Sequence, residues 1–414
     1  MAKKAHAFNL LIMTLYWVSY ASGLNDRSLF TLEKAQSRLA SSVFAYIESN
    51  RDRVIDEWIQ LTEIPAPSGH EEKRAIYMHD EFRKAGLDNV HVDAFGNVIG
   101  LWKGKAGGKI ILLTAHMDTV FQGVWEIEVE REENVLKAPG IGDDTASLIN
   151  LLWSVRALKH AGFQPENTYY FMATTGEEVG FVGMKQFFDK AEEVFDIVLA
   201  LDGDLGKVHY GALGFGGGRI TFKGPGAHTM QSRGVPNPNL AVAKAIGRLY
   251  KIHLLEEPLD KWTILNIGMI GGGKVSNAVS QESFFSVDLR SADQEELERV
   301  QREVKHISVD VAQELGVEVE FDLNEDSRAY QIPGARESFL VKTVLDILDY
   351  LNVSGLEVDP LGSTEANVGI EKGVLSVNLG RTYGRYKHSL REEADIDGLF
   401  LAMKQILLLL ICLE

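Results

Sequence analysis

Short runs of apolar, largely β-branched residues alternate along this chain with longer stretches in which apolar residues recur at helical spacing. The short runs predict buried strands, and the longer stretches predict helices. Between residues 32 and 202 the predicted strands are 90–93, 97–102, 110–113, 168–174 and 197–201, and the predicted helices are 32–63, with an interruption near Asn50, 71–85 and 148–158. This alternation predicts a sheet covered by helices.

The pattern changes after about Gly214. Predicted strands at 219–223, 263–270, 283–289 and 317–323 and predicted helices at 240–254 and 294–315 follow in the order β-α-β-β-α-β. That order is typical of a ferredoxin-like unit, which can fold as an inserted domain. The first pattern resumes with a helix at 339–351, a strand at 374–379 and a closing helix from about residue 395. We therefore predict an α/β domain over residues 32–214 and 326–414, whose mixed sheet is flanked by helices, and an α+β lid over residues 215–325.

Composition narrows the class of protein. A chain of 414 residues that is 45% hydrophobic and 24% charged is an ordinary globular protein, for which two domains are the default expectation. The formal net charge of −17 argues against nucleic acid as a partner, because phosphate binding needs a basic face. The single cysteine, Cys412, excludes an intrachain disulfide.

The first residues predict export. Lys3 and Lys4 precede an apolar run over residues 8–18, and small residues around Ala21 and Gly23 suit a signal-peptidase cut. We predict a cleaved signal peptide over residues 1–23 and a secreted or periplasmic protein; an uncleaved anchor or a disordered extension is the alternative, with a cytoplasmic location if the run is not a signal. The run is shorter than the ~20 residues of a membrane span, so no stable span is expected after cleavage. A second apolar stretch, residues 406–413, is predicted to end a core helix.

Metal-competent side chains follow the predicted strands and helix starts. They are His116, Asp118, Asp143, Glu177, Glu178, Asp202 and His388. Each has a simpler explanation when taken alone: Asp143 as a helix cap, Asp202 as a turn residue, His388 as a solvated loop histidine. Because ligands in open α/β sheets bind beyond the carboxyl ends of the strands, their joint occurrence there favours a site for two cations that share one carboxylate.

The segments HMDTV, GIGDD, TTGEEVG, LALDGD and KHSLREE resemble the five site motifs of the co-catalytic zinc exopeptidases and deacylases. That family includes peptidase T, glutamate carboxypeptidase, succinyl-diaminopimelate desuccinylase, acetylornithine deacetylase and aminoacylase. The resemblance extends from about Ile55 to the C-terminus and includes the lid. The segments GSTEANV and TTGEE are most similar to the peptidase T side of the family.

The resemblance implies a role for each residue of the cluster. His116 and Asp202 would hold one Zn²⁺, Glu178 and His388 would hold the other, and Asp143 would bridge both, with Mn²⁺ or Co²⁺ as possible substitutes. Two further residues would serve catalysis. Asp118 would orient the His116 ring through its second nitrogen, and Glu177 would be the general base.

Three lid residues also match family positions. His228, in FKGPGAHTM, matches the histidine that reaches a carbonyl oxygen of the substrate, often from the neighbouring subunit. Asn277 and Arg290 match positions that bind polar groups of the substrate, Arg290 through its planar fork. A structural role is the alternative for each. The resemblance also implies a homodimer formed through the lid.

The chain departs from the family pattern at two places. Thr145 stands where family members commonly carry lysine, two residues after the bridging aspartate. Arg381 and Arg385 add positive charge where the family loop is usually rich in glycine. Two interpretations of these arginines stay open: they meet an acidic substrate, or they pair with Glu392 and Glu393.

The function predicted from the sequence is a zinc metallopeptidase that cleaves a peptide bond next to a free terminus of short peptides, as an aminopeptidase or a di/tripeptidase. An N-acyl-amino-acid deacylase or a carboxypeptidase of the same family is the first alternative, because it would use the same metals and base. A catalytically inactive binding protein on the same fold is the distant alternative.

Overall fold

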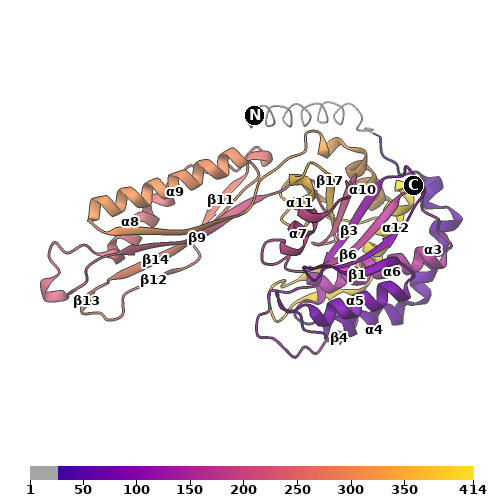
Figure 1. Cartoon of the computed structure of the whole chain (residues 1–414), viewed down its shortest axis with the longest axis horizontal. Helices are drawn as coiled ribbons and strands as arrows, with labels where there is room; N and C mark the ends of the chain where they lie inside the picture. The colour runs from indigo at the N-terminus through magenta and orange to yellow at the C-terminus, as the bar shows by residue number, and fades with distance from the viewer. Residues whose placement is uncertain (1–26) are drawn as a thin grey trace. The chain divides into compact units, whose positions relative to one another are not determined.

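The structure is a computed structural model that describes residues 27–414 (Figure 1). The predicted signal peptide therefore lies outside the described residues. The chain divides into two compact units. Of the described residues, 27–210, 332–358 and 364–414 form the first, and Gly211–Gln331 with Asp359–Ser363 form the second. The predicted lid, residues 215–325, lies within the second unit.

An eight-stranded mixed sheet is the centre of the first unit, in the order β1-β2-β6-β3-β7-β17-β8-β16. The strands are β1 Asp88–Val92, β2 Val98–Trp102, β3 Ile110–His116, β6 Thr168–Thr174, β7 Ile197–Leu201, β8 Lys207–His209, β16 Glu357–Asp359 and β17 Leu375–Leu379. Strands β6, β3, β7 and β17 are parallel neighbours, whereas β2 runs antiparallel to β1 and β6. The predicted mixed α/β sheet is confirmed.

Helices cover both faces of this sheet, with α6 and α12 on one and α7 and α11 on the other (Figure 1). The helices of the unit are α2 Leu32–Ala35, α3 Arg38–Ser49, α4 Arg51–Thr62, α5 Glu72–Lys84, α6 Ser147–His160, α7 Val182–Lys190, α10 Phe339–Tyr350, α11 Ala366–Glu371 and α12 Ile396–Leu413, with a 3-10 turn at Ala335–Glu337. A second, four-stranded sheet joins β18 Gly384–Arg385, β19 Glu393–Asp395, β5 Val135–Lys137 and β4 Glu130–Glu132.

Helix α12 is the most apolar helix of the first unit. Within residues 27–414 it is the one helix long and apolar enough to cross a membrane, and 83% of it is buried inside the protein. Leu407, Leu408 and Leu409 are completely buried against the core. The stretch predicted to end a core helix therefore does so.

The second unit contains the predicted β-α-β-β-α-β order. Its elements are β9 Gly214–Lys223, α8 Pro238–Leu249, β11 Thr263–Asn266, β12 Ile270–Gly272, β14 Glu282–Ser291, α9 Gln294–Leu315 and β15 Glu318–Ser327, with the short pair β10 Ala227–His228 and β13 Ala278–Val279 and 3-10 turns at Thr229–Gln231 and Leu259–Lys261. The sheet order is β11-β14-β9-β15, with β12 on β14, and α8 and α9 pack on one face of it.

Strand β9 begins five residues before its predicted start at Arg219. Its first half is glycine-rich, so it lacks the β-branched side chains that mark a strand in the sequence. Glycine is required there: a Cβ on Gly217 would lie 2.0 Å from the carbonyl oxygen of Val287 on the neighbouring strand.

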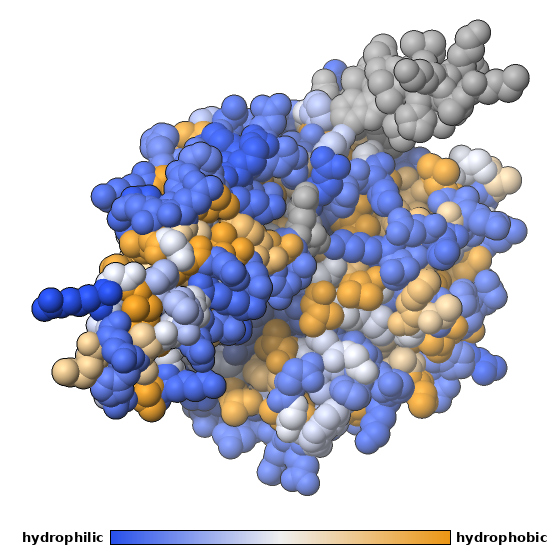
Figure 2. All heavy atoms as spheres, turned by 60° about the vertical axis from the view of Figure 1, so that its left-hand side comes forward, coloured by the Kyte–Doolittle hydropathy of each residue, from blue (hydrophilic) through white to orange (hydrophobic). Residues whose placement is uncertain are grey.

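The surface fits the composition. In the view of Figure 2 hydrophilic residues dominate, and hydrophobic residues form small scattered groups. This distribution is ordinary for a chain with 24% charged residues.

Candidate metal centre

Three parallel strands bring the first residues of the site together. β3 ends at His116, β6 ends just before the Glu177–Glu178 pair, and β7 ends just before Asp202. Because β3 lies between β6 and β7 with all three parallel, their carboxyl ends share one edge of the sheet. The alternation of strands and helices along the sequence therefore places these side chains at one edge of the sheet.

A loop held by Glu392 delivers Asp143. The loop is an irregular turn, Ile141–Ala146, that leads into α6, and Asp143 has non-helical backbone angles within it. The Glu392 carboxylate accepts hydrogen bonds from the backbone N–H groups of Gly140, Gly142 and Asp143, at 2.8, 3.1 and 2.8 Å. Burial, with the Asp143 charge second, raises the pKa of Glu392 to about 7. Glu392 thus fixes the loop, a role that sequence reasoning missed.

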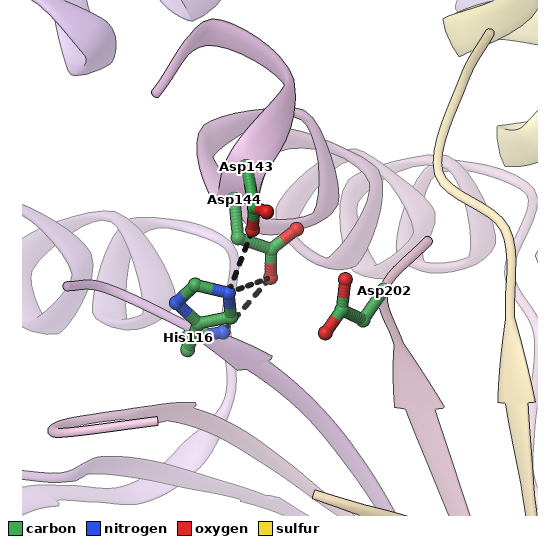
Figure 3. Close-up of side chains that lie close together, drawn as sticks. All are labelled: His116, Asp143, Asp144 and Asp202. Carbon is green, nitrogen blue, oxygen red and sulfur yellow. Dashed lines mark hydrogen bonds and ion pairs between the residues drawn. The ribbon is translucent and has the colours of Figure 1, made fainter. Parts of the chain in front are cut away.

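Two groups of potential ligands share Asp143. His116, Asp143, Asp144 and Asp202 form one (Figure 3), and Asp143, Glu178 and His388 form the other; in each, one ligand atom per residue lies within 4.8 Å of the others. Oδ1 of Asp143 lies 3.0 Å from Nε2 of His116, and Oδ2 lies 3.3 Å from Nε2 of His388. Opposite oxygens of one carboxylate therefore face the two histidines, which is the arrangement of a bridging ligand.

The chemistry of these donors fits divalent cations. Imidazole nitrogen and carboxylate oxygen are ligands of zinc and related metals. Oε1 of Glu178 is buried and, within the described part of the chain, has no hydrogen-bond partner, although Nε2 of His388 lies 3.3 Å away. The nearby carboxylates of Asp143 and Glu178, each with an oxygen 3.3 Å from Nε2, raise the pKa of His388 to about 10, so this position favours positive charge.

Asp144 is a member of the first group that sequence reasoning did not assign. Its Oδ2 accepts a hydrogen bond from the backbone N–H of His116 at 3.0 Å and lies 3.8 Å from Nε2 of the same residue. Burial raises the pKa of Asp144 well above its ordinary value, with the charges of His116 and Arg381 opposing the shift. The signal in the sequence was its place next to Asp143.

Asp118 holds both His116 and the Glu177–Glu178 turn. Its Oδ1 lies 3.4 Å from Nδ1 of His116 and accepts the backbone N–H of Glu177 at 2.9 Å, while its Oδ2 accepts the Ser68 hydroxyl at 2.7 Å. Burial opposes ionisation of Asp118, yet the hydrogen bond with His116 and these donors lower its pKa below the ordinary value. Nδ1 of His116 thus faces Asp118, and Nε2, 3.0 Å from Oδ1 of Asp143, is the ring nitrogen that would bind a cation.

Glu177 is buried and forms a third group of potential ligands with His116 and Glu178, a group that does not include Asp143. Its Oε2 lies 4.0 Å from Nε2 of His116. Burial raises the pKa of Glu177 well above its ordinary value; the His116 charge opposes this, and the Asp202 and Glu178 charges add to it. A carboxylate in this environment has a high affinity for a proton.

Comparisons with known proteins agree with this architecture. Residues 97–237 match Peptidase family M28, and residues 210–315 match the peptidase dimerisation domain. Together the two matches cover more than half of the chain. The chain belongs to the M28/M20 peptidase family. Its curated relatives include the uncharacterized protein YqjE of Bacillus subtilis, which is 27% identical over 369 residues, 84% of this chain and 95% of that protein.

Solved structures of other peptidases have the same fold as this M28/M20 peptidase. A tripeptidase from Staphylococcus aureus superposes with a TM-score of 0.78 at 23% identity, covering 88% of this chain and 98% of its own. The aminopeptidase PepT from Bacillus cereus superposes with a TM-score of 0.74 at 22% identity, covering 88% and 99%. At these identities the likeness shows the fold.

The three lid residues of this M28/M20 peptidase all lie in the second unit. Two of them are neighbours there, and the third is separate. His228, on β10, is exposed and pairs in register with Ala278, next to Asn277, whose carbonyl oxygen accepts the N–H of Thr229 at 3.0 Å. Arg290 lies near the other end of β14, where it forms an ion pair with Asp288 at 3.3 Å. Asn277 and His228 are therefore neighbours, and Arg290 is separate from them.

Glu365 gives the M28/M20 peptidase a pH-dependent stability. Burial raises the pKa of this side chain from 4.5 to about 7, with the Thr174 hydroxyl and the His116 charge opposing the shift. Between pH 4.5 and 7 the unfolded chain loses this proton while the folded chain keeps it, so stability falls as pH rises through that window. We expect Glu365→Gln to raise the free energy of unfolding at pH 8 by up to about 3 kcal/mol.

The measurement is urea unfolding of the metal-free protein in chelator, from pH 4.5 to pH 8. The gain from Glu365→Gln disappears towards pH 4.5, where the carboxyl group is protonated in both states. Glu371→Gln, an exposed change at the end of the same helix α11, is the control and leaves stability unchanged. A loss of stability at pH 8 on changing Glu365 contradicts the prediction.

Proposed function

We propose that this protein is a two-metal hydrolase that cleaves the peptide bond next to a free terminus of short peptides. The observation that carries the proposal is Asp143, whose two carboxylate oxygens face His116 and His388 in two overlapping ligand groups. Two Zn²⁺ per chain would be held by this set, with His116 and Asp202 at one position, Glu178 and His388 at the other, and Asp143 shared. When bound, such ions polarise a carbonyl group and acidify a water molecule.

The residues around the metal positions transfer the proton of the attacking water during the reaction. Glu177 accepts a proton from the attacking water and passes it to the leaving amine, because its burial among carboxylates favours its protonated form. Asp118 keeps the His116 ring and the backbone of Glu177 in place through one oxygen, Oδ1. Base and ligands are thus held by one buried carboxylate before substrate binds.

The lid contributes substrate contacts and the dimer. His228 steadies the developing oxyanion from the neighbouring subunit, and Asn277, its neighbour on the β10–β13 pair, and Arg290 bind polar groups of the substrate. The match to the peptidase dimerisation domain supports a homodimer formed through the lid.

Short peptides are favoured as substrates because the fold is shared with a tripeptidase and with the aminopeptidase PepT. The test combines metal analysis with a panel of di- and tripeptides and of N-acetyl and N-succinyl amino acids. We expect about two zinc ions per chain and cleavage of peptides that chelation abolishes and Zn²⁺ restores. Cleavage of the N-acyl amino acids alone would make the protein a deacylase, and a chain that binds no metal and cleaves nothing would be an inactive binding protein.

A further inference from the structure

Arg381 is a permanent positive charge inside the proposed metal centre. Its side chain is 1% exposed, and its guanidinium forms ion pairs with Asp202, with Oδ2 of Asp143 at 3.2 Å and with Oδ1 of Asp144 at 3.4 Å. The sequence analysis left Glu392, Glu393 or an acidic substrate as its partners, and the structure assigns it these three aspartates. Arg385, by contrast, does pair with Glu393, at 3.4 Å.

The charge of Arg381 bears unequally on the two ligand groups. Three of the four members of the His116 group, Asp143, Asp144 and Asp202, contact its guanidinium. In the Asp143–Glu178–His388 group only the shared Asp143 has an ion pair with it. Since arginine stays protonated in proteins, this charge cannot be released when a metal ion arrives.

Nearby packing keeps Arg381 where it is. Its backbone N–H donates to the carbonyl oxygen of Gly203 at 3.1 Å, and its carbonyl oxygen accepts the Asn150 amide at 2.8 Å. The position where the family commonly has lysine holds Thr145, a buried residue whose hydroxyl lies 2.7 Å from that of Thr62. The positive charge that is missing at Thr145 is therefore supplied from a different loop, and it contacts the carboxylates directly.

We propose that Arg381 makes the two metal positions unequal, so that the His116–Asp143–Asp202 position binds divalent cations more weakly than the Asp143–Glu178–His388 position. A fixed positive charge in contact with the carboxylates of one position repels a cation there and competes for their oxygens. The inference rests on the proposed metal-dependent function and deepens it. The Asp143–Glu178–His388 position fills before the His116–Asp143–Asp202 position, so occupancy of the latter limits the fraction of enzyme that holds both ions.

The experiment is calorimetric titration of the metal-free protein with Co²⁺. The unchanged chain shows two classes of Co²⁺ site whose dissociation constants differ by at least about 10-fold. This factor is smaller than the change in affinity that one unit charge in contact with the ligands can cause. Arg381→Gln tightens the weaker class by at least about 10-fold and changes the tighter class much less. Arg385→Gln is the matched control: it removes the same charge four residues away, where the side chain is 71% exposed, and leaves both classes unchanged.

Two ligand variants identify the classes without changing Arg381. Asp202→Asn removes the weaker class, and His388→Gln, at a half-exposed histidine, removes the tighter class. If the buried change at Arg381 prevents folding, as circular dichroism would reveal, these two variants still test the predicted order, because they show which of the two positions is the weaker one. Removal of the tighter class by Asp202→Asn overturns the inference, and so do two classes of equal affinity. A chain that binds no Co²⁺ refutes the metal-dependent function itself.

Discussion

Replacing Glu177 with glutamine lowers turnover of the best peptide substrate by about 10³-fold, in the range that a general base contributes. The amide has the shape of the carboxylate but cannot accept the proton of the attacking water. Both metal ions stay bound, because Glu177 belongs to neither of the two ligand groups that share Asp143 and only to a third group with His116 and Glu178. The measurements are steady-state kinetics and the metal content of the same preparation.

Glu178→Gln is the informative comparison, since it removes the neighbouring carboxylate. Oε1 of Glu178 lies 3.3 Å from Nε2 of His388, so this variant loses affinity at the second metal position, and added Zn²⁺ recovers part of its activity. Added Zn²⁺ does not rescue Glu177→Gln. If Glu177→Gln lost its metal or kept its turnover, the roles assigned to the two adjacent glutamates would have to be exchanged or abandoned.

The parts of the site carried by parallel strands were predictable from the sequence. The apolar runs before His116, Glu177 and Asp202 mark strands by their composition, and parallel strands present their carboxyl ends together. Asp143 and His388 come from irregular loops, where periodicity carries no information. Both were named among the candidate ligands, but their roles, Asp143 as the bridge and His388 as a ligand of the second ion, were expected only from the resemblance to a known family.

The roles that sequence reasoning left open or missed depend on long-range contacts. Arg381 reaches aspartates that are far from it in sequence, and a cation followed closely by Glu392 and Glu393 is equally well explained by local pairing. Glu392 binds backbone N–H groups of a loop about 250 residues earlier, which leaves no mark on side-chain pattern. Contacts of this kind depend on how loops meet, and local spacing does not encode that.

Replacing Asp143 with asparagine removes both metal ions and lowers turnover by about 10⁴-fold. Residues that hydrogen-bond a metal ligand each contribute about 10-fold to 100-fold to metal affinity. Losing a ligand that both ions share is therefore expected to cost at least about 100-fold in affinity at each position. The two losses multiply, because the two ions act on the same reaction. Equilibrium dialysis with Zn²⁺ measures the loss of affinity, and peptide hydrolysis at a limiting Zn²⁺ concentration measures the loss of turnover.

Asp144→Asn is the matched comparison, since Asp144 is adjacent, also buried and a member of the His116 group alone. It weakens one position and leaves the Glu178–His388 position loaded, whereas Asp143→Asn empties both. The contrast depends on geometry alone: each oxygen of Asp143 faces a different histidine, while both Asp144 oxygens serve the side of His116 and Arg381. Equal metal loss in the two variants would mean that Asp143 is not the bridge, and the two-metal assignment would fail with it.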